Sequence, residues 1–469
     1  MHQDGSAASS ATTDARTLRR VILASSLGTL FEWYDFFLYG SLAVFFGGLF
    51  FPKGDDTAQL LASLATFGAG FGVRPLGALV FGHLGDLIGR KYTFLVTMTA
   101  MGLSTALIGV LPTYGSLGLG STALLVALRL LQGLALGGEY GGAATYVAEH
   151  APDERRGYYT SFIQTTATLG FFLSMAVIAT TRSSLEPEQF QAWGWRIPFL
   201  LSFPLLGVSL YIRVKMRESP LFARAKRSGK TSKNPLRESL GSPLNRKYVL
   251  LALFGSTAGM GVTWYTGQFY ALTFLLSSLK LSWQTSYLLV SLALALTCPL
   301  FVFFGWLSDR IGRNKVMFSG LALAALTYVP IYMGLVHFAN PGLAPQTDES
   351  QVNHLAVVLL LALQMVYVCM IYGPTAAFLV EMFPTQIRYT SMSLPYHLGT
   401  GWFGGFLPLI ATAVTTSAWA KAQFGAGAVY AGLIYPIVVC VMTLVVGGLF
   451  IRETKHHRID SDVHPFASK

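Results

Sequence analysis

The feature that most limits how this chain can fold is a succession of twelve apolar runs. They lie at about 21–50, 57–82, 91–111, 121–149, 157–181, 193–212, 248–276, 284–307, 315–337, 353–382, 390–416 and 427–451. A membrane-spanning helix needs about 20 apolar residues. Helices are also the only open-chain structures that satisfy the backbone in hydrocarbon, and the runs lack the alternation of a membrane barrel. We therefore predict an all-α membrane protein with twelve transmembrane helices.

Composition supports this class of protein. Hydrophobic residues make up 53% of the 469 residues and charged residues only 12%, whereas soluble domains carry about 25% charged residues. A soluble, disordered or coiled-coil protein is therefore excluded. The cysteines (Cys298, Cys369 and Cys440) lie in separate apolar runs without metal-ligand spacing. We expect packing residues there, and no metal site.

Lysine and arginine set the expected orientation. With the N-terminus placed inside, 26 of these residues fall on the inner side and four on the outer side. This bias predicts a multi-pass protein of the cell (inner) membrane with both termini cytoplasmic. A basic stretch at 213–247 reads as a cytoplasmic linker beside anionic lipid, and not as a nucleic-acid site. It separates N-terminal and C-terminal six-helix units at 21–212 and 248–452, with tails at 1–20 and 453–469.

The two halves carry related motifs. A Gly-x-x-x-Asp-x-x-Gly-Arg stretch ends at Arg90 and recurs in the second half with an offset of 223, while a Glu-x-x-Pro-x-x-x-Arg stretch from Glu149 to Arg156 recurs from Glu381 to Arg388. Two ordered matches at equivalent helix boundaries indicate two related halves. The residues that we expect to act in gating are Gly82, Asp86, Gly89, Arg90, Asp309 and Arg313.

The duplicated Gly-x-x-x-Asp-x-x-Gly-Arg loop resembles that of the major facilitator superfamily. Five further stretches resemble its metabolite:proton symporter group, which includes permeases for α-ketoglutarate, citrate, shikimate and proline/betaine. They are Glu32-Trp-Tyr-Asp35-Phe, Arg74-Pro75-Leu-Gly, Gly137-Gly-Glu139-Tyr-Gly-Gly, Trp193-Gly-Trp-Arg196-Ile-Pro-Phe and Phe383-Pro-Thr-Gln-Ile-Arg388-Tyr. The resemblance covers about residues 20–452. It implies two six-helix bundles around a central cavity, alternating access, and uptake driven by the proton gradient without a cofactor.

Five ionisable residues lie deep in the apolar runs, all in the first half: Glu32, Asp35, Arg74, Arg129 and Glu139. Charged groups in a membrane are costly and therefore indicate function. Glu32 and Asp35 share one helix face, and nearby carboxylates resist joint ionisation. We predict that this pair couples transport to protons, although a permanently paired structural role is the alternative. Arg74, Arg129 and Glu139 are expected as further charge partners in the cavity.

The roles of the arginines stay open. Arg74 either pairs with a carboxylate of the first span or binds an anionic substrate through both guanidinium nitrogens. Arg129 resembles the fourth-span arginine that the superfamily often links to proton transfer, and a helix-to-helix hydrogen bond is the other reading. Arg196 is expected at the membrane interface and less so at the substrate.

Polar and aromatic residues of the spans are candidates for the substrate cavity. They are Tyr39, Trp264, Tyr265, Gln268, Gln364 and Tyr372. Trp264 and Tyr265 also fit an aromatic belt at the membrane surface. His397 can titrate near neutral pH, but we expect a structural hydrogen bond there.

These features predict a secondary active transporter that takes up a small organic acid by proton symport and works as a monomer. A symporter of a zwitterion such as proline or betaine is the alternative, followed by an exporter of apolar compounds. The expected partners are a small-molecule substrate, protons and the lipid bilayer. We do not expect an enzyme, because the spans show no metal or nucleophile constellation, and the P-loop sequence that would bind ATP is missing.

Overall fold

The computed structural model describes residues 15–54, 56–214, 227–228, 234–344, 347–457 and 459, apart from some side chains, Glu139 among them. The spans of the N-terminal half are α1 (Ala15–Phe50), α2 (Asp56–Leu87), α3 (Arg90–Val110), α5 (Leu119–His150), α6 (Arg156–Ser183) and α8–α9 (Arg196–Leu200 and Ser202–Val214). The spans of the C-terminal half are α12–α13 (Pro243–Ala252 and Ala258–Tyr265), α15 (Trp283–Ile311), α16 (Arg313–Ala339), α17 (His354–Glu381), α18–α19 (Arg388–His397 and Leu407–Thr416) and α21 (Ile434–Phe450). Short helices are α4 (Tyr114–Leu117), α7 (Pro187–Gln189), α11 (Pro235–Gly241), α14 (Ala271–Thr273) and α20 (Ala418–Phe424).

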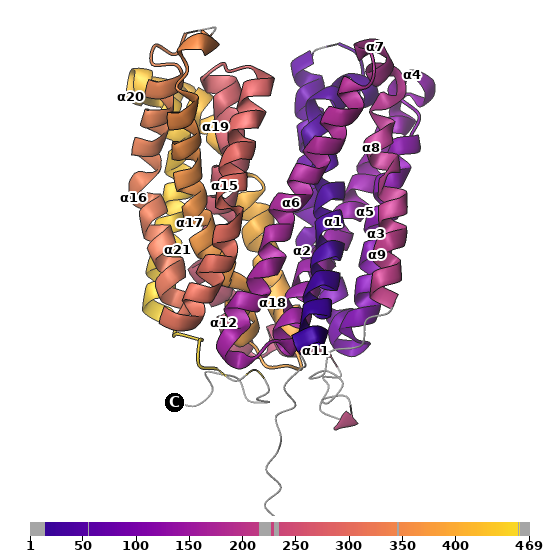
Figure 1. The fold of residues 1–469 in the computed structure, drawn as a ribbon, viewed down its shortest axis with the longest axis vertical. Helices are drawn as coiled ribbons and strands as arrows, with labels where there is room; N and C mark the ends of the chain where they lie inside the picture. The colour runs from indigo at the N-terminus through magenta and orange to yellow at the C-terminus, as the bar shows by residue number, and fades with distance from the viewer. Residues whose placement is uncertain are drawn as a thin grey trace, which may run out of the picture.

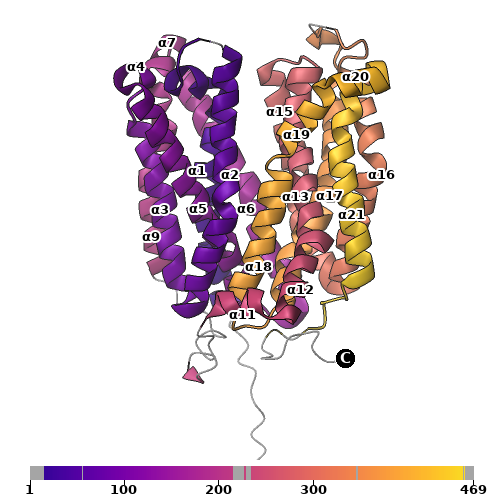
Figure 2. The ribbon, with the colours of Figure 1, turned by 180° about the vertical axis from the view of Figure 1, so that it is seen from behind.

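The twelve spans form two bundles (Figures 1 and 2). Within the described residues, ten helical stretches are long and apolar enough to cross a membrane. Helices α1 and α2, of 36 and 32 residues, run beside them in the N-terminal bundle. The predicted twelve-helix, two-bundle architecture is therefore confirmed.

One end of the molecule holds the start of α1, the short helix α11 and the last residues of α21 (Figure 1). We call it the linker end. The bundles meet there, where α2 packs on α18 and α6 packs on α15 and α17. The helices of the two bundles diverge toward the opposite end (Figures 1 and 2). The contacts that join the halves are thus concentrated at the linker end.

Two spans of the C-terminal half are not regular α-helices. π-helical turns interrupt the seventh span at 253–257, 266–270 and 274–278, and the eleventh at 398–404. These two spans pack backbone to backbone, since a Cβ on Gly261 would lie 2.2 Å from the Gly399 carbonyl oxygen. Single π turns often occur at functional sites, which directs attention to the residues beside them.

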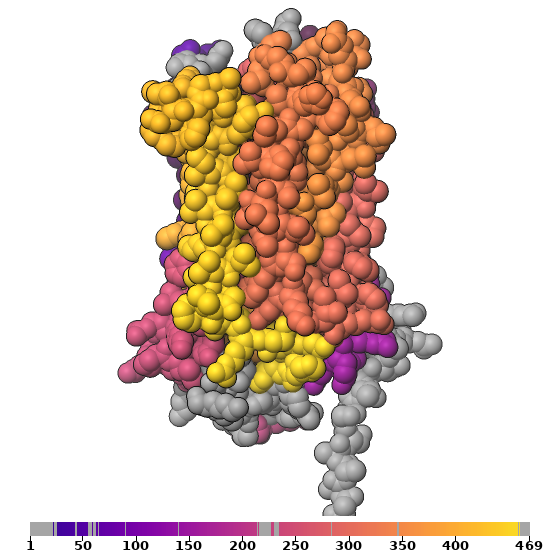
Figure 3. Space-filling model, turned by 90° about the vertical axis from the view of Figure 1, so that its left-hand side faces the viewer, coloured from indigo at the N-terminus to yellow at the C-terminus, as the bar shows by residue number. Residues whose placement is uncertain are grey.

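The outside of the C-terminal bundle is apolar. Helices α16 and α21 form much of the face shown in Figure 3. Leu326 on α16 is 75% exposed and Leu449 on α21 is 72% exposed. An extended exposed apolar face is unfavourable in water. This surface is suited to contact with lipid.

Candidate functional site

Arg74 lies on α2 between the two bundles. Its side chain is 1% exposed, and its guanidinium carbon lies 4.2 Å from the ring centre of Phe36 and 4.3 Å from that of Phe71. Tyr265 of the C-terminal bundle is within hydrogen-bonding reach. Nε and Nη2 have no hydrogen-bond partner, and no ion pair in the described part of the chain includes Arg74. The structure thus gives this arginine aromatic and phenolic neighbours in place of a carboxylate.

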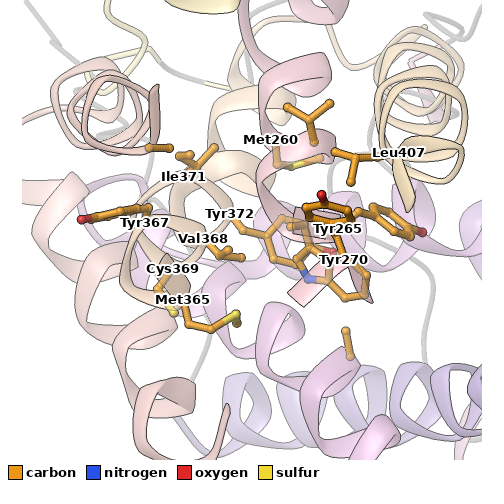
Figure 4. Packing of buried hydrophobic residues seen from close by; sticks show 14 of the residues in the cluster. Met260, Tyr265, Tyr270, Met365, Tyr367, Val368, Cys369, Ile371, Tyr372 and Leu407 are labelled. Carbon is orange, nitrogen blue, oxygen red and sulfur yellow. The ribbon is translucent and has the colours of Figure 1, made fainter. Parts of the chain in front are cut away.

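Tyrosines from both bundles surround this guanidinium group. The rings of Tyr140 on α5 and Tyr396 on α18 stack with centroids 3.5 Å apart and planes 5° apart. The hydroxyls of Tyr396 and Tyr372 are 2.7 Å apart, and Gln164 Nε2 donates to Tyr140 over 2.7 Å. Tyr372, Tyr396 and Tyr265 all interact electrostatically with Arg74. We call Tyr140, Tyr265, Tyr372 and Tyr396 the tyrosine cluster; Figure 4 shows Tyr265 and Tyr372 in their packed surroundings.

An aromatic layer adjoins the cluster and also joins the bundles. Trp33 and Phe37 on α1 face Trp264 of the C-terminal bundle, with ring centroids 6.1 and 6.2 Å apart. Phe71 meets Tyr265 edge to face at 5.5 Å. Trp264 and Tyr265 are 5% and 3% exposed. They are therefore part of the interface between the bundles and not of a belt at the membrane surface.

Arg129 and Asp35 are joined by a chain of polar side chains inside the N-terminal bundle. Arg129 donates to Gln132 over 2.6 Å, and Gln132 donates to the Thr105 hydroxyl over 2.7 Å. Thr105 lies within hydrogen-bonding reach of Asp35, whose Oδ1 accepts from Ser202 over 2.5 Å. No ion pair within the described residues includes Asp35. This carboxyl is therefore solvated by hydroxyl groups.

The other predicted acids and polar residues are distributed over both bundles. Glu32 is buried one turn before Asp35, and the side chain of Glu139 lies outside the described residues. Gln268 and Gln364 are buried in the C-terminal bundle, and neither amide atom of Gln364 has a hydrogen-bond partner.

Tyr39 lies apart from the tyrosine cluster. Its ring sits 4.3 Å from the guanidinium carbon of Arg129, and its hydroxyl donates to the Ser63 carbonyl oxygen over 3.2 Å. The structure therefore groups Tyr39 with Arg129 inside the N-terminal bundle.

At the linker end, an aspartate from each half contacts the start of a helix in the other half. Asp86 Oδ2 accepts from the backbone nitrogen and the hydroxyl of Thr390, over 2.9 and 2.8 Å, where α18 begins. Asp309 accepts from the backbone nitrogens of Gly157 and Tyr158, over 2.8 and 2.7 Å, where α6 begins. A carboxylate at a helix N-terminus satisfies free N–H groups and the helix dipole. Each aspartate therefore ties its own bundle to the other.

The repeated Glu and Arg motifs form two crossed ion pairs. Arg388 donates to Glu149 over 2.8 Å, and Arg156 donates to Glu381 over 2.7 Å. Glu381 also accepts from Arg313 over 3.1 Å, and Arg313 in turn holds Asp309 at 2.6 Å. Because Glu149 corresponds to Glu381 and Arg156 to Arg388 in the repeat, each pair joins the glutamate of one half to the arginine of the other.

The chain after α21 crosses the linker end (Figure 3) and contacts this charged cluster. Glu453 accepts from the backbone nitrogen of Arg313 over 2.9 Å, and Thr454 donates to Glu381 over 2.7 Å. His457 lies at the same cluster: burial lowers the pKa of its imidazole, the charge of Glu381 opposes this effect, and that of Arg156 adds to it. The C-terminal segment is thus fastened to the contacts that close the linker end.

The contacts of His397 and Arg196 bear on two expectations from the sequence. His397 is 1% exposed and neither ring nitrogen has a hydrogen-bond partner, so the expected structural hydrogen bond is wrong. Arg196 donates to the carbonyl oxygens of Gly109 and Leu111, over 3.0 and 2.7 Å, at the end of α3. It therefore ties the start of α8 to the end of α3, and its place at the membrane interface stays a prediction.

Sequence reasoning missed three residues of the site: Tyr140, Gln164 and Tyr396. Tyr140 follows Glu139 in the glycine-rich stretch of the fourth span, and Tyr396 precedes His397. Both positions were therefore adjacent to residues already singled out, but sequence alone does not give the face of the helix that meets the other bundle.

Comparisons with known proteins give one consistent picture. The family described as "Sugar (and other) transporter" matches residues 21–461. The chain is 35% identical to the inner membrane metabolite transport protein YhjE of Escherichia coli K12, covering 95% of this chain and 97% of that protein. It is 34% identical to the shikimate transporter of the same organism, covering 85% and 88%. The solved structure of the major facilitator proton:xylose symporter XylE shares the fold, with a TM-score of 0.75 at 17% identity, covering 94% and 98%.

Proposed function

We propose that this chain takes up a small organic anion together with protons. The premise is that it belongs to the sugar (and other) transporter family of the major facilitator superfamily. The chain is an integral membrane transporter of metabolites and not an enzyme. Substrate class and proton coupling are the proposed parts. They are supported by the charges buried in and beside the bundle interface.

The observation that carries the proposal is the state of Arg74. Within the described residues this buried guanidinium group has no anionic partner, which is costly, and its Nε and Nη2 have no hydrogen-bond acceptor there. A carboxylate can accept two parallel hydrogen bonds from this fork. The surrounding tyrosine cluster offers hydroxyls and ring faces to the rest of the molecule. Shikimate, which one relative is named for transporting, is a carboxylate of this kind.

Asp35 is the better supported proton carrier of the predicted pair with Glu32. Its oxygens meet the hydroxyls of Ser202 and Thr105 and no cation in the described part of the chain. A carboxyl in this setting can exist protonated because no fixed positive charge holds it ionised. The Gln132–Thr105 chain connects it to Arg129, so that a proton on Asp35 alters the surroundings of that arginine.

The linker-end contacts fit alternating access. The excess of Lys and Arg at this end supports a cytoplasmic location. With the Asp86 and Asp309 contacts and the crossed ion pairs formed, access from the cytoplasm is closed. Transport then requires these contacts to break and the contacts toward the other end to tighten, as in transporters whose halves rock around a central site.

Counterflow in proteoliposomes tests the substrate class. Purified protein is loaded with unlabelled compound and challenged with labelled carboxylates, amino acids and betaines. We expect exchange of a carboxylate in the wild type and in Arg237→Gln, which changes an exposed arginine of α11, and none in Arg74→Gln or Arg74→Lys, because an ammonium group cannot replace planar bidentate contacts. Exchange of proline or betaine alone would establish the zwitterion alternative, and near-normal exchange by Arg74→Gln would refute the role of Arg74.

A further inference from the structure

A groove with a volume of about 470 Å³ lies between the seventh span and α21 of the C-terminal bundle. The π-helical turn of the seventh span packs on α21 (Figure 2), where a Cβ on Gly447 would lie 2.4 Å from the Gly255 carbonyl oxygen. Helix α21 ends at Phe450, about 4 Å further along its axis. Helix α12 reaches back about 13 Å from Gly255 to Arg246. The start of α12 therefore extends beyond the end of α21, and the groove runs from this uncovered part into the space between the two helices.

The lining of the groove changes from charged to apolar along its length. Arg246 and Lys247 are exposed at the start of α12, and no ion pair within the described residues includes either of them. Further from the linker end, apolar side chains of both spans line the groove: Leu250, Leu251, Phe254, Met442 and Val446. Leu250 is 48% exposed, so the groove opens to the outside of the bundle. A ligand that fits it has a negatively charged head and an apolar chain.

We propose that this groove binds one anionic phospholipid, with its phosphate on Arg246 and Lys247 and an acyl chain along the apolar lining. A guanidinium group can donate two parallel hydrogen bonds to a phosphate, and the lysine adds a compact positive charge. The helix rises about 12 Å from Arg246 to Phe254, and the hydrocarbon of one leaflet is about 15 Å deep. An acyl chain in the groove therefore stays within the leaflet that holds its headgroup.

The charges of the groove favour an anionic lipid over a zwitterionic one. The described lining holds two cations and no carboxylate, so a headgroup with a net negative charge is better matched than one that carries its own ammonium group. A second groove of about 710 Å³, at the start of α16, is also mostly apolar but offers a single cation, Lys315. That groove supplies a residue of the same end of the molecule for a matched control.

Native mass spectrometry of the purified, delipidated full-length protein measures the selectivity. The probes are phosphatidylglycerol and phosphatidylcholine with identical acyl chains. We expect the wild type to bind one phosphatidylglycerol more tightly than phosphatidylcholine. The double variant Arg246→Gln/Lys247→Gln should bind phosphatidylglycerol roughly 30-fold more weakly, about fivefold for each cation removed, with little change for phosphatidylcholine. The matched control Arg237→Gln/Lys315→Gln removes one exposed arginine and one exposed lysine outside this groove and should bind as the wild type does.

Cross-linking locates the lipid. Phosphatidylglycerol with a photoreactive group in its acyl chain should label peptides of α12 and α21 in the wild type and in the control, and much less in the double variant. Equal affinity for the two lipids, unchanged affinity in the double variant, or labelling confined to other helices would overturn the proposal. Glycerol 1-phosphate that binds as tightly as the lipid would also overturn it, because the site would then hold a soluble phosphate and not a lipid. None of these measurements depends on the transported substrate.

Discussion

Asp309→Asn is expected to open the linker end of the transporter. In the closed arrangement the Asp309 carboxylate accepts hydrogen bonds from the backbone nitrogens of Gly157 and Tyr158 in the opposite bundle. Its ion pair with Arg313 lies within its own bundle. Because both partners belong to one bundle, that ion pair can form whether the bundles are together or apart. Its loss therefore changes the free energies of the closed and open states by similar amounts. Only the two contacts between the bundles decide the shift.

The size of the shift follows from these two bonds. An amide in place of the carboxylate can still accept one or both, but without the charge. A hydrogen bond to a charged group contributes about 1.5–3 kcal/mol and a neutral one about 1 kcal/mol, so two bonds lose about 2 kcal/mol. Because every 1.4 kcal/mol is a factor of ten, about 2 kcal/mol corresponds to a roughly 30-fold change toward the open state.

Double electron-electron resonance between spin labels at the linker end measures this ratio. Labels at positions 154 and 247 replace exposed Glu154 and Lys247, one on each bundle, after the three native cysteines have been changed to alanine. We expect the wild type to show mainly the short distance and Asp309→Asn to gain a substantial population at a longer one.

The matched control is Asp348→Asn. Asp348 is exposed at the opposite end, and among the described residues its side chain bonds to Ser350 and Gln351 of its own turn, so this variant should give the wild-type distances. If Asp309→Asn has wild-type distances too, while folding and labelling normally, the contact with the start of α6 does not hold the gate closed.

Four further results are expected. Asp86→Asn should slow turnover in proteoliposomes with little change in substrate affinity, since its contact lies at the gate; lost binding with intact turnover would contradict this. Glu381→Gln should lower the free energy of unfolding by about 3–5 kcal/mol in thermal or denaturant melts, because buried arginines lose their charged partner; an unchanged melting temperature would argue against the crossed pairs. Asp35→Asn should keep counterflow and lose accumulation driven by a pH gradient, whereas full accumulation would move the proton site elsewhere. Since burial lowers the pKa of His457, its protonation favours the undocked segment. The protection of the amides of residues 451–457 against exchange, corrected for the intrinsic effect of pH, should therefore fall below about pH 6.5, and His457→Gln but not the exposed His456→Gln should remove this acid sensitivity.

Much of the fold was predictable because lipid imposes a simple rule on sequence. Each span needs an unbroken apolar run, and the runs gave the number of helices. The repeated motifs of the gating loops gave the two related halves. The π-helical turns at 266–270 and 398–404 were not predictable, because an apolar run has the same hydropathy in an α-helix and in a π turn. The close approach of Gly261 to Gly399 was hidden for the same reason.

The site was predictable only in part, because sequence gives depth in the membrane but not the direction of a side chain. Asp35 was found by its charge, yet its partner Ser202 is an ordinary hydroxyl 167 residues away. The crossing of Glu149 to Arg388 was equally hidden, since the repeat shows that the residues correspond and not which half each one contacts. Tyr140 and Tyr396 are common residue types, and only their stacking at 3.5 Å marks them.

The reciprocal contacts of Asp86 and Asp309 between the two halves should help to prevent the empty carrier from leaking. Opening the linker end separates Asp86 from Thr390 and Asp309 from Gly157 in the same movement, and it exposes helix N-termini that then need water as a partner. Both halves lose equivalent contacts together. An intermediate with only one of these contacts broken loses the free energy of that contact, while the remaining contact still prevents the bundles from separating. Between the bundles, Arg74 lies against aromatic rings of α1 and α2 and forms no ion pair within the described residues. Its guanidinium group is already buried, at 1% exposure. We infer that the bundles close around it at the end opposite the linker end only when a bound anion offsets its charge. This requirement links movement of the bundles to the presence of cargo.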